Sequence, residues 1–334
     1  MIIVESYTVA VAMCIVTMMC WGSWANTQKL ATKRWPFQLY YWDYCLGVVL
    51  LSLIMAFTLG SMGSLGRGFI ADISQISRWA LVMAFLGGVV FNIANILRVA
   101  AIDIAGMSVA FPIGIGIALV EGVIINFAAD QKGNPVVLFA GVAAVMMAII
   151  IDAIAYKKLP SQGEKTSAKG IVISIVAGVL MGLFFRLVQE AMVTDFAAPE
   201  AGKVGPYAAV VVFSVGLFLS SFIWNTLVMF KPFAGEPVRY GDYFKLGDMR
   251  LHLIGILGGA IWGVGMSFAN IASGAAGDAI SYGLGQGATM IAAIWGVFIW
   301  KEFAQAPKGT NKLLALMFLF FVAGLGLIIL AKTI

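Results

Sequence analysis

The sequence predicts an all-α membrane protein in which ten transmembrane helices form two inverted five-helix repeats. Three observations lead to this prediction: the composition, ten apolar segments of membrane-spanning length, and an internal alignment between the two halves of the chain. Of the 334 residues, 61% are hydrophobic and 11% are charged, whereas an ordinary soluble domain has about 25% charged residues. This composition excludes a cytosolic enzyme, a nucleic-acid-binding protein and a secreted disulfide scaffold.

The apolar segments are long enough to cross a bilayer. A hydrocarbon core of about 30 Å needs about 20 mostly apolar helical residues. Helices are expected because the glycine- and alanine-rich segments lack the alternating pattern of a membrane β-barrel. The loops between them are too short for a separate soluble domain. The expected spans are 6–28, 40–60, 79–98, 103–127, 135–156, 169–190, 206–230, 249–272, 277–299 and 311–332.

The distribution of lysine and arginine predicts the orientation in the membrane. The net charge is +5, and most basic residues fall in the loops after the odd-numbered spans. Cytoplasmic loops carry such an excess of basic residues. The sequence therefore predicts a multi-pass protein of the cell (inner) membrane, with both termini outside and the central loop in the cytoplasm.

Two halves of the chain resemble each other. Residues 86–117 align without a gap to residues 257–288, and the identities include Gly106 on Gly277. The two windows cover the third and fourth spans of each five-span half. Because five is an odd number, the second half enters the membrane from the opposite side, as in many secondary transporters. The predicted division is an N-terminal repeat (1–157), a cytoplasmic connecting loop (158–168) and a C-terminal repeat (169–334), within one integral membrane domain.

Spans 4 and 9 carry residues that interrupt or bend helices at equivalent positions. In inverted-repeat transporters, interrupted helices supply free backbone groups to a substrate site near the membrane midplane. The alternative is that the glycines only allow helices to pack closely. The predicted hinge residues are Pro112, Gly114, Gly116, Gly283, Gly285 and Gly287.

Two charged residues lie deep within spans. Glu121 is in span 4 and Arg186 is in span 6, both surrounded by apolar residues. Ionisable groups inside a membrane are costly and indicate function, so we predict that Glu121 is a coupling or gating carboxylate and that Arg186 is its neighbour. Two alternatives are a purely structural pair that locks two helices, and pairing of Arg186 with Glu190 at i,i+4.

Aromatic and amide side chains in several spans suit a neutral polar substrate, because aromatic rings stack on flat or sugar-like ligands and amides form hydrogen bonds. The aromatic residues of span 1 also fit an interfacial aromatic belt. The predicted cavity residues are Trp21, Trp24, Gln28, Asn92, Asn95, Tyr282 and Gln286.

Signatures of metal, cofactor or catalytic chemistry are not found in the sequence. Cys14, Cys20 and Cys45 are interpreted as core thiols, and His252 has no second histidine or cysteine nearby. Residues 163–166 (GEKT) lack the glycine spacing of a phosphate-binding loop. We expect no metal site, no cofactor and no enzymatic activity.

Four motifs resemble the drug/metabolite transporter superfamily, and within it the branch of ureide permeases and glucose/ribose porters. They are 20–24 (CWGSW), 106–109 (GMSV), 126–130 (NFAAD) and 295–303 (WGVFIWKEF). The resemblance covers nearly the whole chain and implies secondary, proton-coupled transport of small polar solutes through a cavity between spans 1, 3, 4, 6, 8 and 9. Plant ureide permeases have a longer central loop, and Glu121 replaces an expected apolar residue. Both departures favour a bacterial paralogue with its own specificity.

These observations together predict a secondary active transporter, coupled to a proton or another ion, that moves a sugar, a ureide or a nucleobase by alternating access. A multidrug or metabolite exporter is the alternative within the superfamily, and a channel or a membrane-embedded enzyme is the alternative from another class. The expected partners are a small-molecule substrate and the lipid bilayer, with no nucleic acid. The oligomeric state is expected to be a monomer or a homodimer.

Overall fold

The computed structural model describes residues 1–31, 35–159, 167–233 and 235–334. In this part of the chain, ten helical segments are long and apolar enough to span a membrane, which confirms the predicted fold class. The helices are α1 (Tyr7–Ser23), α2 (Ala25–Ala31), α3 (Phe37–Phe57), α4 (Phe69–Ser74), α5 (Arg78–Ala105), α6 (Met107–Asp130), α7 (Pro135–Lys157), α8 (Ala168–Ala191), α9 (Pro206–Phe230), α10 (Tyr240–Leu246), α11 (Met249–Ala276), α12 (Asp278–Gly285), α13 (Ala288–Ile294), the π-helical turn η1 (Trp295–Ile299) and α14 (Thr310–Leu330).

Spans 3 and 8 end seven and four residues later than predicted, at Ala105 and Ala276, because each continues to a glycine in a conformation that other residues rarely adopt. Helix α5 runs to Ala105 and is followed by Gly106, whose φ is 78°. Helix α11 runs to Ala276 and is followed by Gly277, whose φ is 93°. Glycine has no Cβ and adopts positive φ freely. A single glycine thus turns the chain from span 3 into span 4 and from span 8 into span 9, at positions that the internal alignment pairs.

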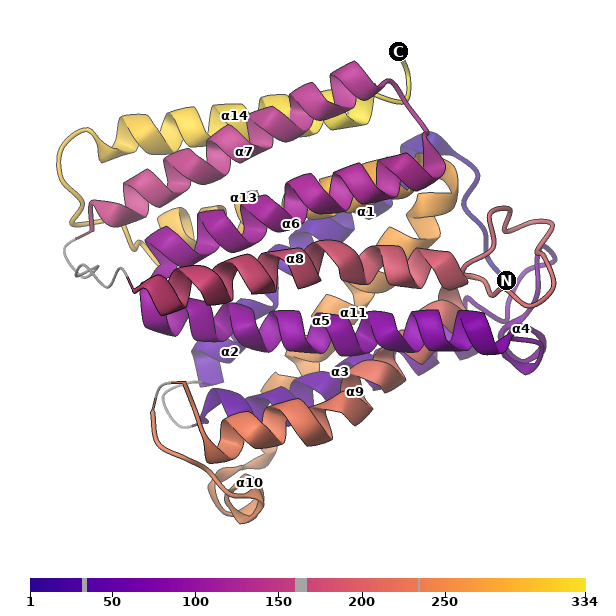
Figure 1. Ribbon diagram of the computed structural model, residues 1–334, viewed down its shortest axis with the longest axis horizontal. Coiled ribbons are helices and arrows are strands. Elements are labelled where there is room, and N and C mark those ends of the chain that lie inside the picture. The colour runs from indigo at the N-terminus through magenta and orange to yellow at the C-terminus, as the bar shows by residue number, and fades with distance from the viewer. Residues whose placement is uncertain (32–34, 160–166, 234) are drawn as a thin grey trace.

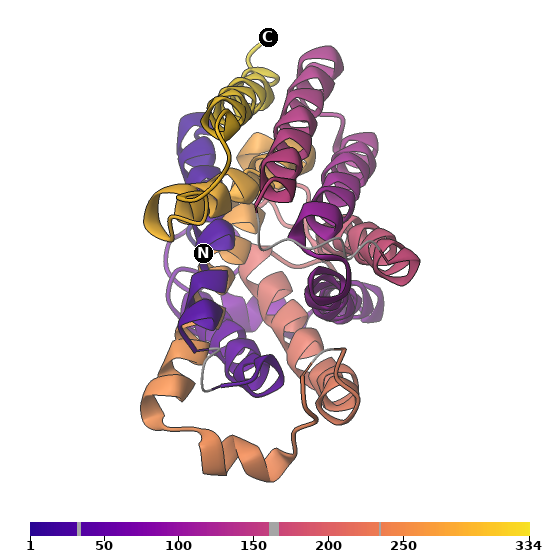
Figure 2. The ribbon, with the colours of Figure 1, turned by 90° about the vertical axis from the view of Figure 1, so that its left-hand side faces the viewer.

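The long helices lie side by side along one axis of the molecule (Figure 1), and Figure 2 views them close to end-on. Helix α7 packs on α14 at one edge of the bundle, α5 packs on α8 and α9, and α11 packs on α1 and α3. The pairing of span 3 with spans 6 and 7 matches the pairing of span 8 with spans 1 and 2, as two related halves require. The inverted relation of the halves itself stays a prediction.

Glycines at paired positions of the two halves allow backbones to approach closely. A Cβ on Gly88 of α5 would lie 2.0 Å from the Phe213 carbonyl oxygen of α9, and a Cβ on Gly259 of α11 would lie 1.9 Å from the Tyr44 carbonyl oxygen of α3. Only glycine fits at both crossings, as is usual where membrane helices touch.

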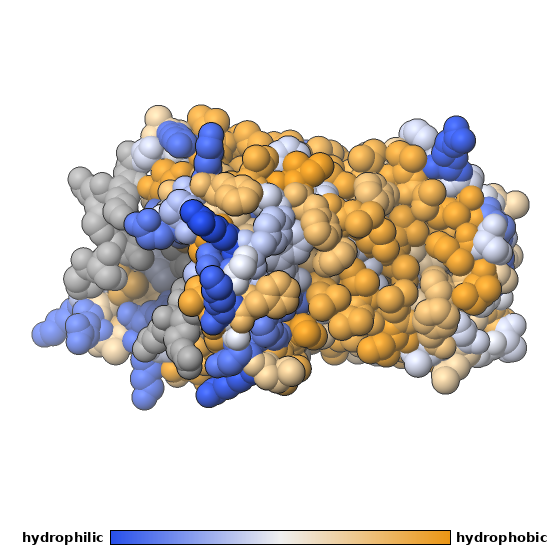
Figure 3. Space-filling model, turned by 90° about the horizontal axis from the view of Figure 1, so that it is seen from below, coloured by the Kyte–Doolittle hydropathy of each residue, from blue (hydrophilic) through white to orange (hydrophobic). Residues whose placement is uncertain are grey.

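Apolar side chains dominate the outer surface of the bundle. Figure 3 shows an orange surface over most of one face, with hydrophilic residues gathered toward one end and a few at the other. Exposed large residues include Val136, Ile223 and Leu319 on three different spans. A soluble protein rarely exposes so continuous an apolar area, so this surface faces lipid.

The two ends of the bundle differ in charge. We call the end with the loops after spans 1, 3, 5, 7 and 9 the basic end, and the end with both chain termini (Figure 1) the terminal end. The predicted connecting loop, 158–168, is at the basic end, between α7 and α8; residues 160–166 of it, including the GEKT segment, are outside the described residues.

Candidate transport cavity

A cavity of about 470 Å³ lies between the helices in the half of the bundle nearest the basic end. This volume suits a small organic molecule. The cavity reaches the surface beside Lys29 and Asp103, both of which are exposed. Its lining comprises Trp21, Gly22, Trp24, Ala25, Asn26, Gln28, Lys29, Phe91, Arg98, Val99, Ile102, Asp103, Phe111, Ile115, Asp152, Tyr156, Met181, Phe184, Trp262, Gln286, Ala288, Thr289, Ala292, Ala293, Trp295, Gly296, Trp300 and Glu302.

Aromatic rings form one wall of the cavity. Trp21 is stacked on Trp262, with 5.9 Å between ring centroids and 12° between planes, and Trp262 in turn lies 4.3 Å from Phe91. Trp24 packs on Tyr44 of α3 at 4.9 Å. These contacts fix the orientation of the indole rings, so the wall offers rigid flat faces for a flat ligand.

The regular helix of span 1 is interrupted for one residue at the cavity, Trp24, which keeps helical φ and ψ angles of −56° and −35°. Helix α1 ends at Ser23, Trp24 follows, and α2 begins at Ala25. Two indole N–H groups near the end of span 9 hold this break: Trp295 donates to Ser23 Oγ at 2.9 Å, and Trp300 donates to Asn26 Oδ1 at 2.6 Å. The interrupted part of span 1 is therefore tied to span 9 directly over the cavity.

The predicted hinge residues lie in a broken helix in span 9 and in a continuous helix in span 4. Span 9 is broken, because α12 ends at Gly285 and α13 begins at Ala288, with i→i+3 hydrogen bonds between them. Span 4 is one continuous helix, α6, which contains Pro112. Gly114 and Gly116 lie inside this helix, and the Gly114 backbone contacts Gly178 of α8. In span 4 the glycines serve close packing, while the hinge role remains a prediction for both spans.

The break in span 9 also depends on close packing. A Cβ on Gly285 would lie 2.7 Å from the Trp21 ring, and a Cβ on Gly287 would lie 2.5 Å from Met18 Sδ. Gly283 has more room, with 3.3 Å to its nearest neighbour, Val123. Gly285 thus lets Trp21 take its place in the aromatic wall.

Four of the seven predicted cavity residues line the cavity, namely Trp21, Trp24, Gln28 and Gln286. The other three, Asn92, Asn95 and Tyr282, are fully buried between helices and do not line it. Tyr282 donates to the carbonyl oxygens of Ala118 and Met181, at 3.0 and 3.1 Å, and so joins spans 4, 6 and 9. A polar residue inside a span can form hydrogen bonds either with a neighbouring helix or with a ligand. Asn92, Asn95 and Tyr282 form them with neighbouring helices.

The predicted contact between Glu121 and Arg186 is not formed in the described structure. Arg186 forms ion pairs with Glu190 and with Asp278, the latter at 3.2 Å. Glu121 lies against Gly182, one turn before Arg186 on α8. The physical reason is that α6 begins at Met107 instead of at residue 103, which places Glu121 about one turn nearer the basic end. The coupling or gating role of both residues stays a prediction.

Ion pairs and hydrogen bonds close the terminal end near Arg186. The Asp278 amide donates to Asp130 Oδ2 at 3.1 Å, and Asp130 pairs with Lys132 at 3.2 Å. Spans 4, 6 and 9 are thereby linked through charged groups, because Arg186 belongs to span 6.

A second cluster at the terminal end joins two loops. Arg67 pairs with Asp72 at 2.9 Å and donates to the carbonyl oxygens of Pro199 and Glu200. Asp72 also accepts the Gly205 amide at 2.6 Å. Burial raises the pKa of the Asp72 carboxyl above its usual value, although the hydrogen bonds from Gly205 and Arg67 oppose this shift.

Acidic residues occupy the cavity beside the basic end. Glu302 accepts from Tyr156 at 2.7 Å and pairs with Lys29 at 2.7 Å. Asp152 is 4% exposed, and its Oδ1 has no hydrogen-bond partner among the described residues. Asp152 lines the cavity but was not among the predicted site residues.

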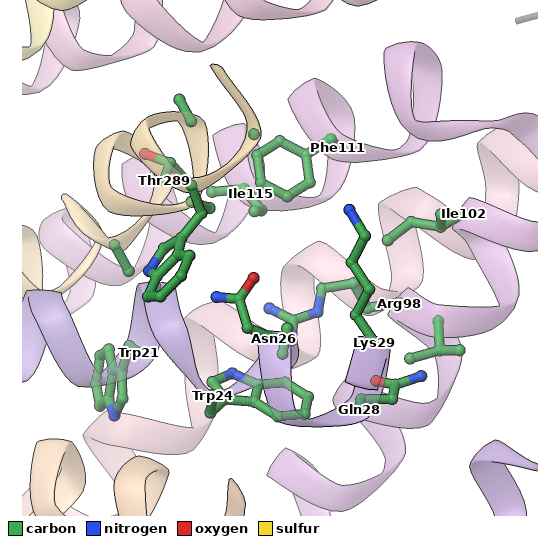
Figure 4. A pocket seen from close by; sticks show the side chains of 18 of the residues that line it. Trp21, Trp24, Asn26, Gln28, Lys29, Arg98, Ile102, Phe111, Ile115 and Thr289 are labelled. Atoms are coloured by element: carbon green, nitrogen blue, oxygen red, sulfur yellow. The ribbon is translucent and has the colours of Figure 1, made fainter. Parts of the chain in front are cut away.

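Several lining residues were not predicted: Asn26, Lys29, Arg98, Trp262, Trp295, Trp300 and Glu302 are the main ones. Span 3 was predicted to end at Arg98, but α5 continues seven residues beyond it to Ala105. Figure 4 shows Arg98 near Trp24 and Asn26 in the middle of the cavity. The signal in the sequence was Gly106 itself, a helix-ending glycine that would have extended the predicted helix and brought Arg98 inside.

Comparison with known proteins identifies the family. The ureide permease family model matches residues 40–165 and 158–331, which together are most of the chain. The chain belongs to the ureide permease family. Ureide permease 1 of Arabidopsis thaliana is 23% identical over an alignment 384 positions long, gaps included, and ureide permease 4 of the same plant is 24% identical over 395 positions; each alignment covers 98% of both chains. A solved crystal structure with 14% identity and a TM-score of 0.61 covers 98% of this chain and 99% of its own, which shows a shared fold.

Membership in this family of permeases confirms the predicted resemblance and supports a multi-pass membrane transporter. Among the described residues, no group of three or more His, Cys, Asp or Glu side chains is placed to hold a metal ion. The three cysteines are free, and Cys14 and Cys45 are buried in the core.

Proposed function

We propose that this ureide permease family member is a secondary transporter of small, flat, amide-containing solutes of the ureide class. The observation that carries the proposal is the cavity, in which indole faces and amide groups line one enclosed space. A ureide is planar and carries both carbonyl and N–H groups, so it can stack on Trp21, which is partly exposed to the cavity, while Gln28 and Gln286 bind its edges. The curated relatives carry the name ureide permease.

We propose alternating access as the mechanism, with the basic end in the cytoplasm. In the described state the cavity reaches the surface at the basic end. At the terminal end, the Arg186–Asp278 and Arg67–Asp72 pairs join neighbouring elements. This asymmetry is that of an inward-facing carrier. Movement of the interrupted spans 1 and 9 would close the basic end when the terminal end opens.

We propose proton coupling through a carboxylate. Asp152 is the first candidate, because it is buried, lines the cavity and leaves one oxygen unpartnered among the described residues. Glu121 is the second candidate, on its position inside span 4. An inward proton gradient should accelerate uptake by the wild type, and Asp152→Asn should abolish this acceleration. If Glu121→Gln abolishes it and Asp152→Asn does not, the assignment passes to Glu121.

Counterflow tests the transport function. Proteoliposomes preloaded with unlabelled allantoin should accumulate labelled allantoin transiently, and glucose inside should give little exchange. Only a carrier shows such trans-stimulation, so a channel or an enzyme would fail the test. If the protein exchanges glucose and not allantoin, the substrate is a sugar and not a ureide. If it exchanges only cationic drugs, it is an exporter.

A further inference from the structure

Arg98 is a positive charge at the centre of the cavity wall. It lies on α5, lines the cavity, and its guanidinium carbon is 5.9 Å from the centroid of the Trp24 ring. Its Nη2 donates to Asn95 Oδ1 at 2.8 Å. In Figure 4 the guanidinium points toward the space beside Asn26.

The guanidinium has no carboxylate partner within 4.0 Å in the described part of the chain. Three acidic residues share the cavity, but Glu302 is engaged by Lys29 and Tyr156, and neither Asp103 nor Asp152 forms an ion pair with Arg98. Arg98 is partly exposed and lines the cavity, so the guanidinium N–H groups that do not bind Asn95 are available to a ligand there. A negatively charged group in the cavity would therefore bind there favourably.

A chain of buried side chains orients Arg98. Asn92 donates to Ser220 Oγ at 2.8 Å and accepts from Tyr41 at 3.0 Å. Asn95 in turn donates to Tyr41 at 3.3 Å, which leaves Asn95 Oδ1 to accept from Arg98. Asn92, Asn95 and Tyr41 are fully buried. The two asparagines thus fix the guanidinium that reaches the cavity, and do not bind the solute themselves.

We propose that Arg98 binds a carboxylate of the transported solute, so that the preferred substrates are ureides carrying an acid group. The proposal rests on the proposed function and narrows its substrate class. A carboxylate accepts two parallel hydrogen bonds from a guanidinium, while the planar ureido group of the same molecule occupies the cavity beside Arg98. Asn95 is a positioning residue, because it acts through Arg98.

A matched pair of probes tests the proposal on the purified full-length protein. N-carbamoylglycine carries a carboxylate at neutral pH, and N-carbamoylglycinamide replaces it with a neutral amide and keeps the ureido group. Titration calorimetry should give the acid a dissociation constant at least about tenfold lower than that of the amide, as expected for a charge-assisted hydrogen bond.

Variants assign this preference to Arg98. Arg98→Gln should weaken binding of the acid about 10- to 100-fold and leave binding of the amide within about threefold. Arg98→Lys should retain part of the preference, because the charge stays but the two-point geometry is lost. Asn95→Leu should reduce the acid-to-amide ratio while Arg98 is intact. Arg78→Gln, on the exposed start of the same helix, is the matched control and should change neither constant.

The outcomes separate this proposal from the proposed function. Equal binding of acid and amide by the wild type overturns the role of Arg98 and leaves ureide transport standing. Binding of neither probe overturns the role of Arg98, and it overturns the proposed function as well only if allantoin counterflow also fails. An unchanged acid preference in Arg98→Gln also overturns the role. If Arg98→Gln does not fold, the wild-type ratio and Arg98→Lys decide: no preference in the wild type, or an undiminished one in Arg98→Lys, overturns the role.

Discussion

Removal of the Asp278 charge should open the terminal end. Asp278 pairs with Arg186 at 3.2 Å across spans 9 and 6, and the two side chains are only 16% and 20% exposed. Asp278→Asn removes a charge-assisted hydrogen bond, worth about 1.5–3 kcal/mol. Arg186 keeps its pair with Glu190, so the lower value applies. A loss of about 1.5 kcal/mol raises the population of the open terminal end about tenfold.

Cysteine labelling measures this population. Ser273 lies on α11, is 2% exposed, and donates to Gln189 of α8 at 3.4 Å. In a background with Cys14, Cys20 and Cys45 replaced by alanine, Ser273→Cys should react slowly with a water-soluble maleimide. Because labelling requires opening, Asp278→Asn should raise its rate about tenfold.

A neutralised surface pair is the control. Lys203 and Glu200 lie at the same end, 3.9 Å apart, and are 37% and 47% exposed. Such exposed pairs contribute little, so Lys203→Gln should leave the labelling rate unchanged. An equal rate in Asp278→Asn and its parent would refute the reasoning that the Arg186–Asp278 pair holds the terminal end closed.

Three further predictions follow from the cavity, the packing and the terminal end. Trp21→Leu should raise the Kd for a ureide about five- to tenfold through loss of stacking, as measured by calorimetry, and an unchanged Kd would remove Trp21 from the binding surface. Gly259→Ala should lower the melting temperature, because its Cβ would lie 1.9 Å from the Tyr44 carbonyl oxygen, with a cost of about 1–3 kcal/mol; Gly326→Ala, with no atom within 4 Å of the new Cβ, should not lower it, and equal losses would contradict the packing. Burial raises the pKa of Asp72, so its contribution to stability is complete below its unfolded pKa of about 3.9 and falls as pH rises through the folded pKa. Asp72→Asn should therefore flatten the decline in melting temperature above about pH 4, and an unaltered decline would assign it to another group.

The spans were predictable because bilayer thickness fixes both their length and their polarity. Their ends were less predictable. Hydropathy falls at Arg98, yet the helix continues until Gly106 turns the chain. The continuation of α5 by about two turns placed Arg98 in the cavity, and the later start of α6, by about one turn, placed Glu121 out of register with Arg186. Backbone conformation at one glycine, not hydropathy, sets the depth of both charged residues.

It was harder to predict which polar residues face the cavity and which face a neighbouring helix. Trp21, Trp24, Gln28 and Gln286 line the cavity as predicted. Asn92 and Asn95 share the same helix face as Arg98, but they are satisfied by Tyr41 and Ser220 on neighbouring helices. A single sequence shows that a polar residue inside a membrane needs a partner and does not show whether that partner is protein or ligand. Trp300 and Glu302 follow span 9, and their contacts with span 1 depend on how distant segments pack.

Protection of a cavity cysteine by substrate is the most direct test that this cavity is the transport site. Ala292 lines the cavity and is partly exposed, whereas Ser273 is buried outside it. In the cysteine-free background, allantoin or N-carbamoylglycine should slow maleimide labelling of Ala292→Cys at concentrations that saturate counterflow. The same solutes should not cover Ser273→Cys, which lies outside the cavity. Undiminished labelling of Ala292→Cys in a variant that still exchanges labelled ureide would contradict the account, because the solute would then bind elsewhere.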